Sequence, residues 1–278
     1  FKAGILDEYI LNGTIILILI NCIVASFATE KAAKKIIIET EDDSESLLKS
    51  NGAASEHILL PISNIEKIEK ILEFAVLIKD KKSANPVSLL SVVSNNEEAE
   101  INLLKTRNKL EEFVKQASAT ETKVNIITTL DHNAASGITR ISREIMADIL
   151  ILGWPQRTGF LDKLIGEKID AILNNSNKTI FICQLEKPLV LHKRIIIAAP
   201  PLTEHENGFS LWLNKFTKLA QELSIPMHIY CNEATQKVMD KLLKKSKSNA
   251  SVSFTHFTDW EDFLMLSRYI NDDDLFVL

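Results

Sequence analysis

The chain has 278 residues, of which 46% are hydrophobic and 25% charged, so it holds enough apolar material for buried cores and is not a disordered chain. Its net charge of −5 argues against binding of nucleic acid through phosphate contacts, and no nucleic-acid partner is expected. Cys22, Cys183 and Cys231 lie far apart and join no histidine cluster, so neither a disulfide scaffold nor a metal site is expected. The first residue is Phe1 rather than Met, which indicates part of a longer protein.

An uncharged stretch near the start predicts a membrane-spanning helix. Residues 9–29 contain no charged side chain, and at about 1.5 Å per residue they would form a helix of roughly 30 Å, the thickness of a bilayer core. Acidic residues precede the stretch and Lys31, Lys34 and Lys35 follow it, which by the positive-inside tendency places the C-terminal side in the cytoplasm. The sequence therefore predicts a protein of the inner (cytoplasmic) membrane, with the lipid bilayer as a partner.

Two other interpretations of residues 9–29 are a buried helix of a soluble protein and a secretory signal peptide. A charge-free run of this length is unusual in a soluble helix, and the region before it is acidic where that of a signal peptide is basic. Thr14 and Asn21 are seven positions apart and share a helix face, where polar groups pack against other helices better than against lipid. We therefore expect this helix to belong to a bundle.

Residues 36–55 are predicted to be a linker. An acidic stretch followed by Asn-Gly is typical of a solvated connection between domains. A cation-binding loop is the alternative, but the acidic residues do not have the spacing of an EF-hand. The five carboxylates are Glu39, Glu41, Asp42, Asp43 and Glu45.

Apolar strands and amphipathic helices alternate over the rest of the chain. This alternation predicts an α/β fold with parallel sheets covered on both faces. The predicted strands are 57–63, 87–93, 124–130, 148–153, 178–185, 194–200, 226–231, 251–257 and 274–278. The predicted helices are 65–80, 103–117, 136–147, 161–173, 208–223, 234–245 and 261–270. The order of elements restarts at residue 194, which indicates an internal repeat.

The expected domain organisation has four parts. A membrane helix with a basic exit occupies residues 1–35, and the acidic linker occupies 36–55. Two α/β units follow at 56–187 and 192–278, the second of which is truncated because it lacks its last helix and strand.

The α/β units resemble the universal stress protein domain, a Rossmann-like fold with a parallel five-stranded sheet that binds adenine nucleotide. In that family an Asp after the first strand contacts adenine, and a Gly-x-x-Gly-x(9)-Gly-Ser/Thr motif after the fourth strand holds the phosphates. The sequence GWPQRTGFLDKLIGE follows the fourth predicted strand with the spacing of this motif. The candidate nucleotide-binding residues that the resemblance implies are Ser63, Gly153, Gln156, Gly159, Gly166 and Glu167.

Three of these positions depart from the family pattern. Ser63 replaces the Asp, Gln156 replaces the second glycine, and Glu167 replaces the Ser/Thr. A side chain at 156 hinders close approach of the backbone to phosphate, and a carboxylate at 167 repels it. In the second unit Pro200 stands at the Asp position. We therefore expect no resident cofactor and at most weak binding of adenine nucleotide. The incomplete motif favours a role of Gly153, Gly159 and Gly166 in turns and packing over contact with phosphate.

A second resemblance covers the whole chain. Residues 10–36 look like the last transmembrane helix and basic exit of bacterial cation:proton antiporters, and residues 153–166 are similar to a loop in the cytoplasmic tails of such antiporters. The resemblance implies the C-terminal part of a Na+/H+ or K+/H+ antiporter, with the upstream membrane domain as its partner. The tail would be a regulatory module without catalytic residues. The ion-binding acidic residues of that family lie in upstream helices that this sequence does not contain.

Two other classes of function remain open. A membrane-anchored universal stress protein would bind adenine nucleotide itself, and an enzyme of the wider nucleotide-binding superfamily would need the phosphate loop that is altered here.

Strand 178–185 is apolar enough to pair at a sheet edge. We therefore expect the first unit to pair with the second unit or with its copy in a homodimer.

Overall fold

The computed structural model describes residues 56–62, 68–117, 123–154, 162–246 and 248–278, and gives side chains for all of these except 116–117 and 162–168. Ser55–Leu278 form one compact unit. Among the described residues, no helix has the length and apolar character needed to cross a bilayer. The predicted membrane helix and its lysine flank, the polar pair Thr14 and Asn21, and the acidic linker lie outside the described residues, so what was predicted for them stays a prediction.

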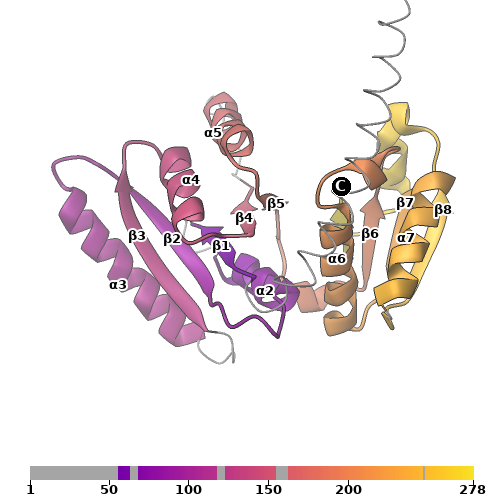
Figure 1. The fold of residues 1–278 in the computed structure, drawn as a ribbon, viewed down its shortest axis with the longest axis horizontal. Helices are drawn as coiled ribbons and strands as arrows, with labels where there is room; N and C mark the ends of the chain where they lie inside the picture. The colour runs from indigo at the N-terminus through magenta and orange to yellow at the C-terminus, as the bar shows by residue number, and fades with distance from the viewer. Residues whose placement is uncertain (1–55, 63–67, 118–122, 155–161, 247) are drawn as a thin grey trace, which may run out of the picture. The chain divides into compact units, whose positions relative to one another are not determined.

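Five parallel strands form the first sheet, in the order β3-β2-β1-β4-β5 (Figure 1). The predicted strands of this unit are confirmed, because parallel strands buried on both faces appear in the sequence as continuous apolar runs. The strands are β1 (Ile58–Pro61), β2 (Val87–Ser94), β3 (Val124–Asp131), β4 (Ile149–Gly153) and β5 (Thr179–Cys183). The helices between them are α2 (Ile68–Ile78), α3 (Ala99–Ala117), α4 (Ala134–Glu144) and α5 (Asp162–Asn175).

Four parallel strands form the second sheet, in the order β8-β7-β6-β9. Strand β9 pairs with β6 as β4 pairs with β1, so the described sheet repeats the first one up to its fourth strand, as the repeat predicted. The strands are β6 (Arg194–Ala198), β7 (Met227–Cys231), β8 (Val252–His256) and β9 (Asp274–Val277). The α-helices are α6 (Phe209–Leu223) and α7 (Glu233–Ser246).

The helix predicted at 261–270 is wrong in type. The segment between β8 and β9 is a 3-10 helix, η5 (Trp260–Tyr269), and its backbone leaves helical geometry at Asp262 (φ −108°, ψ 52°). No side chain caps its start at Asp259, and the Trp260 indole N–H donates to the Phe257 carbonyl at 2.9 Å. An α-helix without a cap is easily replaced by 3-10 turns that local packing holds in place.

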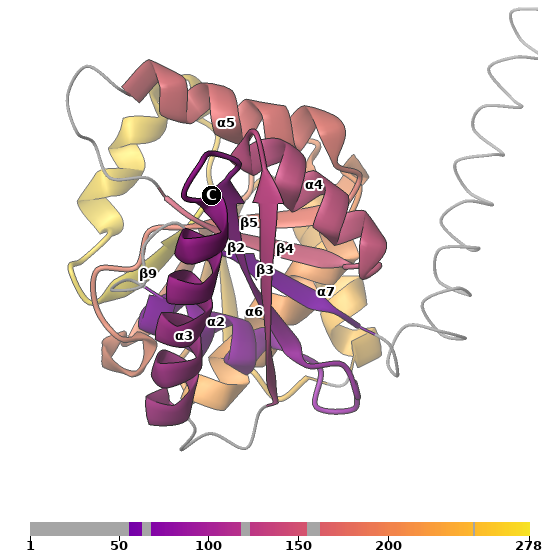
Figure 2. The same ribbon diagram turned by 90° about the vertical axis from the view of Figure 1, so that its left-hand side faces the viewer.

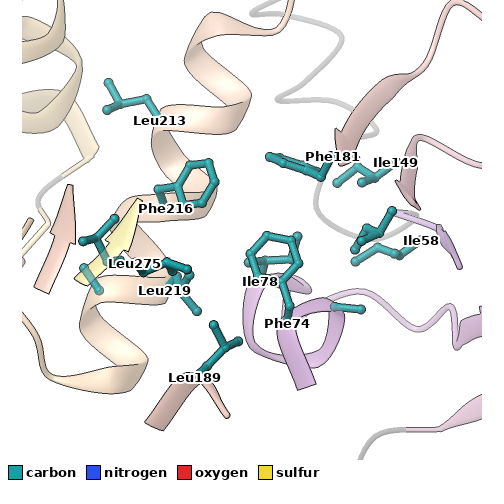
Figure 3. Close-up of a cluster of buried hydrophobic side chains, with 14 of the residues drawn as sticks. Ile58, Phe74, Ile78, Ile149, Phe181, Leu189, Leu213, Phe216, Leu219 and Leu275 are labelled. Atoms are coloured by element: carbon teal, nitrogen blue, oxygen red, sulfur yellow. The ribbon is translucent and has the colours of Figure 1, made fainter. Parts of the chain in front are cut away.

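The largest hydrophobic core contains side chains from both sheets (Figure 3). Along β1, Ile58 and Leu60 point into this core, while Leu59 points to the opposite face. Helix α2 packs on β1 and β4 and also contacts α6, whose Leu213 belongs to the same core. The two halves of the compact unit therefore share one hydrophobic interior.

Different elements cover the outer faces of the two sheets. Helices α4 and α5 cover the face of the first sheet that holds Leu59 and Leu150 (Figure 2). In the second sheet, η5 covers the matching face through Leu266, which packs on Ile196 and Tyr230. Strand β9 is fixed by Asp274, whose carboxylate accepts two hydrogen bonds from Arg194, at 2.9 and 2.7 Å.

Candidate functional site

The structure describes only part of the predicted nucleotide site. Ser63, Gln156 and Gly159 lie outside the described residues, and Gly166 and Glu167 lie on the backbone of α5 within the stretch whose side chains are not described. Gly153 is the last residue of β4. The nucleotide site therefore stays a prediction. The part of its surroundings that the structure describes is the rim of the first sheet where β1 and β4 end.

That rim has the topology of a ligand-binding edge. Strands β1 and β4 are neighbours whose connections leave in opposite directions, and ligands of open α/β sheets bind beyond the carboxyl ends of such strands. At Gly153 a Cβ atom would lie 2.8 Å from Ile71 Cδ1, so a side chain there would require Ile71 to move. The next residue, Trp154, donates its backbone N–H to Cys183 O at 2.7 Å. Burial raises the pKa of the Cys183 thiol to about 12, which disfavours its thiolate form.

The corresponding edge of the second sheet, after β6, holds a carboxylate that belongs to the protein. Glu204 lies in the short 3-10 turn after β6, and its side chain is 7% exposed. Its carboxylate accepts a hydrogen bond from the buried Thr235 hydroxyl at 2.6 Å, in the first turn of α7. Asn232 caps the same helix by accepting the Thr235 N–H at 2.7 Å. A negative charge is stabilised at a helix N-terminus, and here the protein supplies that charge.

A second cluster of charged residues joins the two halves where the described chain begins. The Glu56 carboxylate forms an ion pair with the Lys215 ammonium of α6, and both side chains are about nine-tenths buried (11% and 10% exposed). Glu56 also accepts the Asp80 N–H at 2.9 Å, and its carbonyl accepts the Ser83 hydroxyl at 2.6 Å. The residue that follows the predicted linker is thus bound to the second half and to the end of α2.

Two lysines of α6 satisfy the C-terminal end of α2. Lys215 donates to Ile78 O at 3.0 Å, and Lys218 donates to Lys79 O. The last carbonyls of a helix have no partner within the helix and carry partial negative charge, so cations stabilise them. Burial, together with the nearby Lys215 charge, lowers the pKa of the Lys218 ammonium. The second half therefore provides the cap of a helix in the first half.

Three phenylalanines pack at the same contact. Phe74 of α2, Phe181 of β5 and Phe216 of α6 are each less than 10% exposed. Their ring centroids lie 5.8 Å (Phe74 to Phe181), 6.2 Å (Phe74 to Phe216) and 5.8 Å (Phe181 to Phe216) apart (Figure 3). We call this contact the α2–α6 interface and define it by Glu56, Phe74, Phe181, Lys215, Phe216 and Lys218.

The α2–α6 interface differs from the pairing that the sequence suggested. Strand β5 is an edge of the first sheet, and no strand of the second sheet pairs with it among the described residues. Phe181 contributes its side chain instead, and helices make the contact. The sequence did hold one signal, because Lys215 lies four positions from both Leu211 and Leu219, on the apolar face of its helix. A charge in that position needs a buried partner, which the sequence does not identify.

The comparisons with known proteins give a family and a transporter relative. Residues 54–184 match the universal stress protein family. The chain is also 29% identical over 238 residues to the Na(+)/H(+) antiporter NhaS5 of Synechocystis sp., a match that covers 78% of this chain. The chain spans 33% of the length of that antiporter.

Solved structures share the fold of both halves. A universal stress protein from Archaeoglobus fulgidus has a TM-score of 0.55 at 18% identity, over 78% of this chain and 83% of that one. The cytoplasmic domain of a prokaryotic cation chloride cotransporter has a TM-score of 0.50 at 15% identity, over 74% and 79%. These likenesses confirm the α/β fold with two parallel sheets, and at these identities they show the fold alone.

Proposed function

We propose that this chain, whose residues 54–184 match the universal stress protein family, is the C-terminal part of a monovalent cation:proton antiporter. Residues 9–29 would be its last membrane helix, and the unit from Glu56 onward its cytoplasmic regulatory tail. The tail would act as a binding and interaction module rather than as an enzyme. The antiporter membrane domain would be its partner.

One observation carries this proposal. The similarity to the Na(+)/H(+) antiporter covers 78% of the chain, which is more than the family match at 54–184. The similarity therefore extends beyond the first half into the second half of the chain. The uncharged stretch 9–29, followed by Lys31, Lys34 and Lys35, supports the proposal further, because it is predicted to form a membrane helix whose C-terminal side faces the cytoplasm.

The α2–α6 interface suggests how the tail would act on the membrane domain. The linker joins the described unit at Glu56, and the carboxylate of Glu56 is part of the contact between the halves. An effector that favours one arrangement of the halves would therefore change the attachment point of the linker. Such an effector needs different affinities for the two arrangements.

Removal of the tail tests this function. In the full-length transporter, truncation after residue 50 should leave proton exchange measurable in membrane vesicles and change its rate, or its dependence on pH, by about fivefold or more. The physical reason is that the tail biases an equilibrium and does not line the ion path. The measurement is dye-reported proton exchange at matched protein content, checked by immunoblot. Unchanged exchange across pH and salt would contradict a regulatory role.

The universal stress protein match also supports a second candidate, a membrane-anchored protein that binds adenine nucleotide. We expect the unit 55–278 to bind ATP more weakly than about 100 µM, a free energy of only about −5.5 kcal/mol. Ser63 lacks the carboxylate that would accept from adenine, and Gln156 hinders close approach of the backbone to phosphate. Glu167 adds a negative charge that repels phosphate. Titration calorimetry measures this affinity. A dissociation constant of micromolar order would favour the second candidate.

A further inference from the structure

One exposed face of α7 is a row of lysines. Lys237, Lys241, Lys244 and Lys245 recur at spacings of three and four residues, which places them on one side of the helix, and all four are exposed. The opposite side of the helix, with the buried Thr235 and Met239, packs on the rest of the second half. We call these four residues the α7 lysine face.

The acidic residues of α7 do not neutralise this face. Glu233 pairs with Lys237 at 2.7 Å, but both side chains are more than two-thirds exposed, so this pair is weak. Burial, together with the nearby charge of Asp240, raises the pKa of the Cys231 thiol, and Asp240 itself is half-buried. Within the described residues, neither Lys241 nor Lys244 forms an ion pair.

Helix α3 of the first half provides an internal comparison. It occupies the same place in the repeat, after the second strand, and also carries exposed lysines, at 105, 109 and 115. It carries three acidic residues beside its four basic ones, and Arg107 forms an ion pair with Glu111 at 2.9 Å. A solvated helix shows such mixed charge. The outer face of α7 instead carries four exposed lysines against one exposed carboxylate, Glu233, and this excess of positive charge is expected of a surface with an anionic partner.

We propose that the α7 lysine face docks on the anionic headgroups of a membrane leaflet. Lipid fits better than nucleic acid, because the chain as a whole is acidic, at −5, and would repel a polyanion in solution. A membrane leaflet differs from dissolved nucleic acid because the anchor at residues 9–29 would hold the chain beside the leaflet. This inference rests on the proposed function in one respect, which is that residues 9–29 anchor the chain in a bilayer.

The expected strength suits a tethered contact. Each lysine near an anionic leaflet multiplies the binding constant by about five, so Lys237, Lys241 and Lys244 together give roughly 100-fold, which is weak for a protein free in solution. A tether raises the local concentration of the surface to about millimolar, so the same contact becomes substantially occupied. Docking would also be reversible by salt within the range where surface charges are screened.

Lysine footprinting tests the docking on the chain as it exists. Residues 1–278 are placed in nanodiscs of phosphatidylcholine alone or of phosphatidylcholine with phosphatidylglycerol, and acetylated with a water-soluble amine reagent. In the anionic discs, Lys241 and Lys244 should be modified about threefold or more slowly, and high salt should remove the difference. Lys105 and Lys109 of α3 are exposed and serve as the control in the same sample.

The outcomes separate this inference from the proposed function. Equal modification of the two helices in both kinds of disc overturns the docking, while retention of the chain in discs after an alkaline wash still supports the membrane helix. Protection of α7 in neutral discs as well indicates a contact that does not depend on anionic lipid, and also overturns the docking. If the chain does not enter discs, flotation of residues 55–278 with anionic vesicles at low salt decides. There, K237Q/K241Q/K244Q should lose binding about 100-fold and K105Q/K109Q/K115Q should not.

Discussion

Replacement of Phe216 by alanine should lower the free energy of unfolding of residues 55–278 by about 3–5 kcal/mol. The ring of Phe216 is 6% exposed and lies within 6.2 Å of Phe74 and 5.8 Å of Phe181 by ring centroids. Its removal leaves a cavity at the α2–α6 interface, where the surrounding side chains come from two sheets and cannot easily collapse together. Urea unfolding followed by circular dichroism measures the loss.

Phe276 gives the matched control for this substitution. It is the same residue type on β9, but it is 36% exposed and lies away from the α2–α6 interface. Phe276→Ala should cost less than half as much, because part of its ring is already in water. If the two substitutions lower the unfolding free energy equally, the α2–α6 interface does not contribute the stability that we assign to it.

Replacement of Lys215 by methionine should cost a similar amount, about 3–5 kcal/mol. Methionine keeps much of the length and volume of the lysine side chain, so packing changes little. The loss arises because the Glu56 carboxylate stays buried without its cation, and because the Ile78 carbonyl loses a donor. The measurement is again the free energy of unfolding at neutral pH.

A double variant separates the ion pair from general damage. E56Q/K215M removes both charges, and its cost should be clearly smaller than the sum of the two single costs. Lys81 serves as the control lysine, since it pairs with Glu222 at 2.7 Å while its own side chain is 76% exposed. K81M should change stability by less than about 1 kcal/mol. Additive costs in the double variant would show that Glu56 and Lys215 do not interact in the folded protein.

The strands were predictable from the sequence, and the reason is visible in β2. Its residues 87–93 are apolar or small and lie in a sheet covered on both faces, so burial is recorded directly in the composition. Helix ends were less accurate. Helix α4 begins at Ala134, two residues before its predicted start, because Asn133 accepts the Ala135 N–H at 2.7 Å and so caps the helix.

The type of η5 and the α2–α6 interface were not predictable in the same way. In η5, Phe263 and Leu266 are three positions apart, as on one face of a helix, but the sequence does not reveal that the backbone breaks at Asp262. At the α2–α6 interface, Glu56 and Lys215 are 159 positions apart, and no local pattern links a glutamate after an acidic linker to a lysine on a distant helix. Pairing of this kind is decided by tertiary packing, which periodicity does not encode.

The family match ends at residue 184, but the compact unit that contains it extends to Leu278. If 54–184 were expressed alone, Phe74 and Phe181 would face water, and the carbonyls at the end of α2 would lose the lysines of α6. Exposed aromatic surface of this kind promotes aggregation. Poor solubility of the excised domain would then reflect the place of the cut rather than a defect in the sequence, and recombinant work should keep Ser55–Leu278 together.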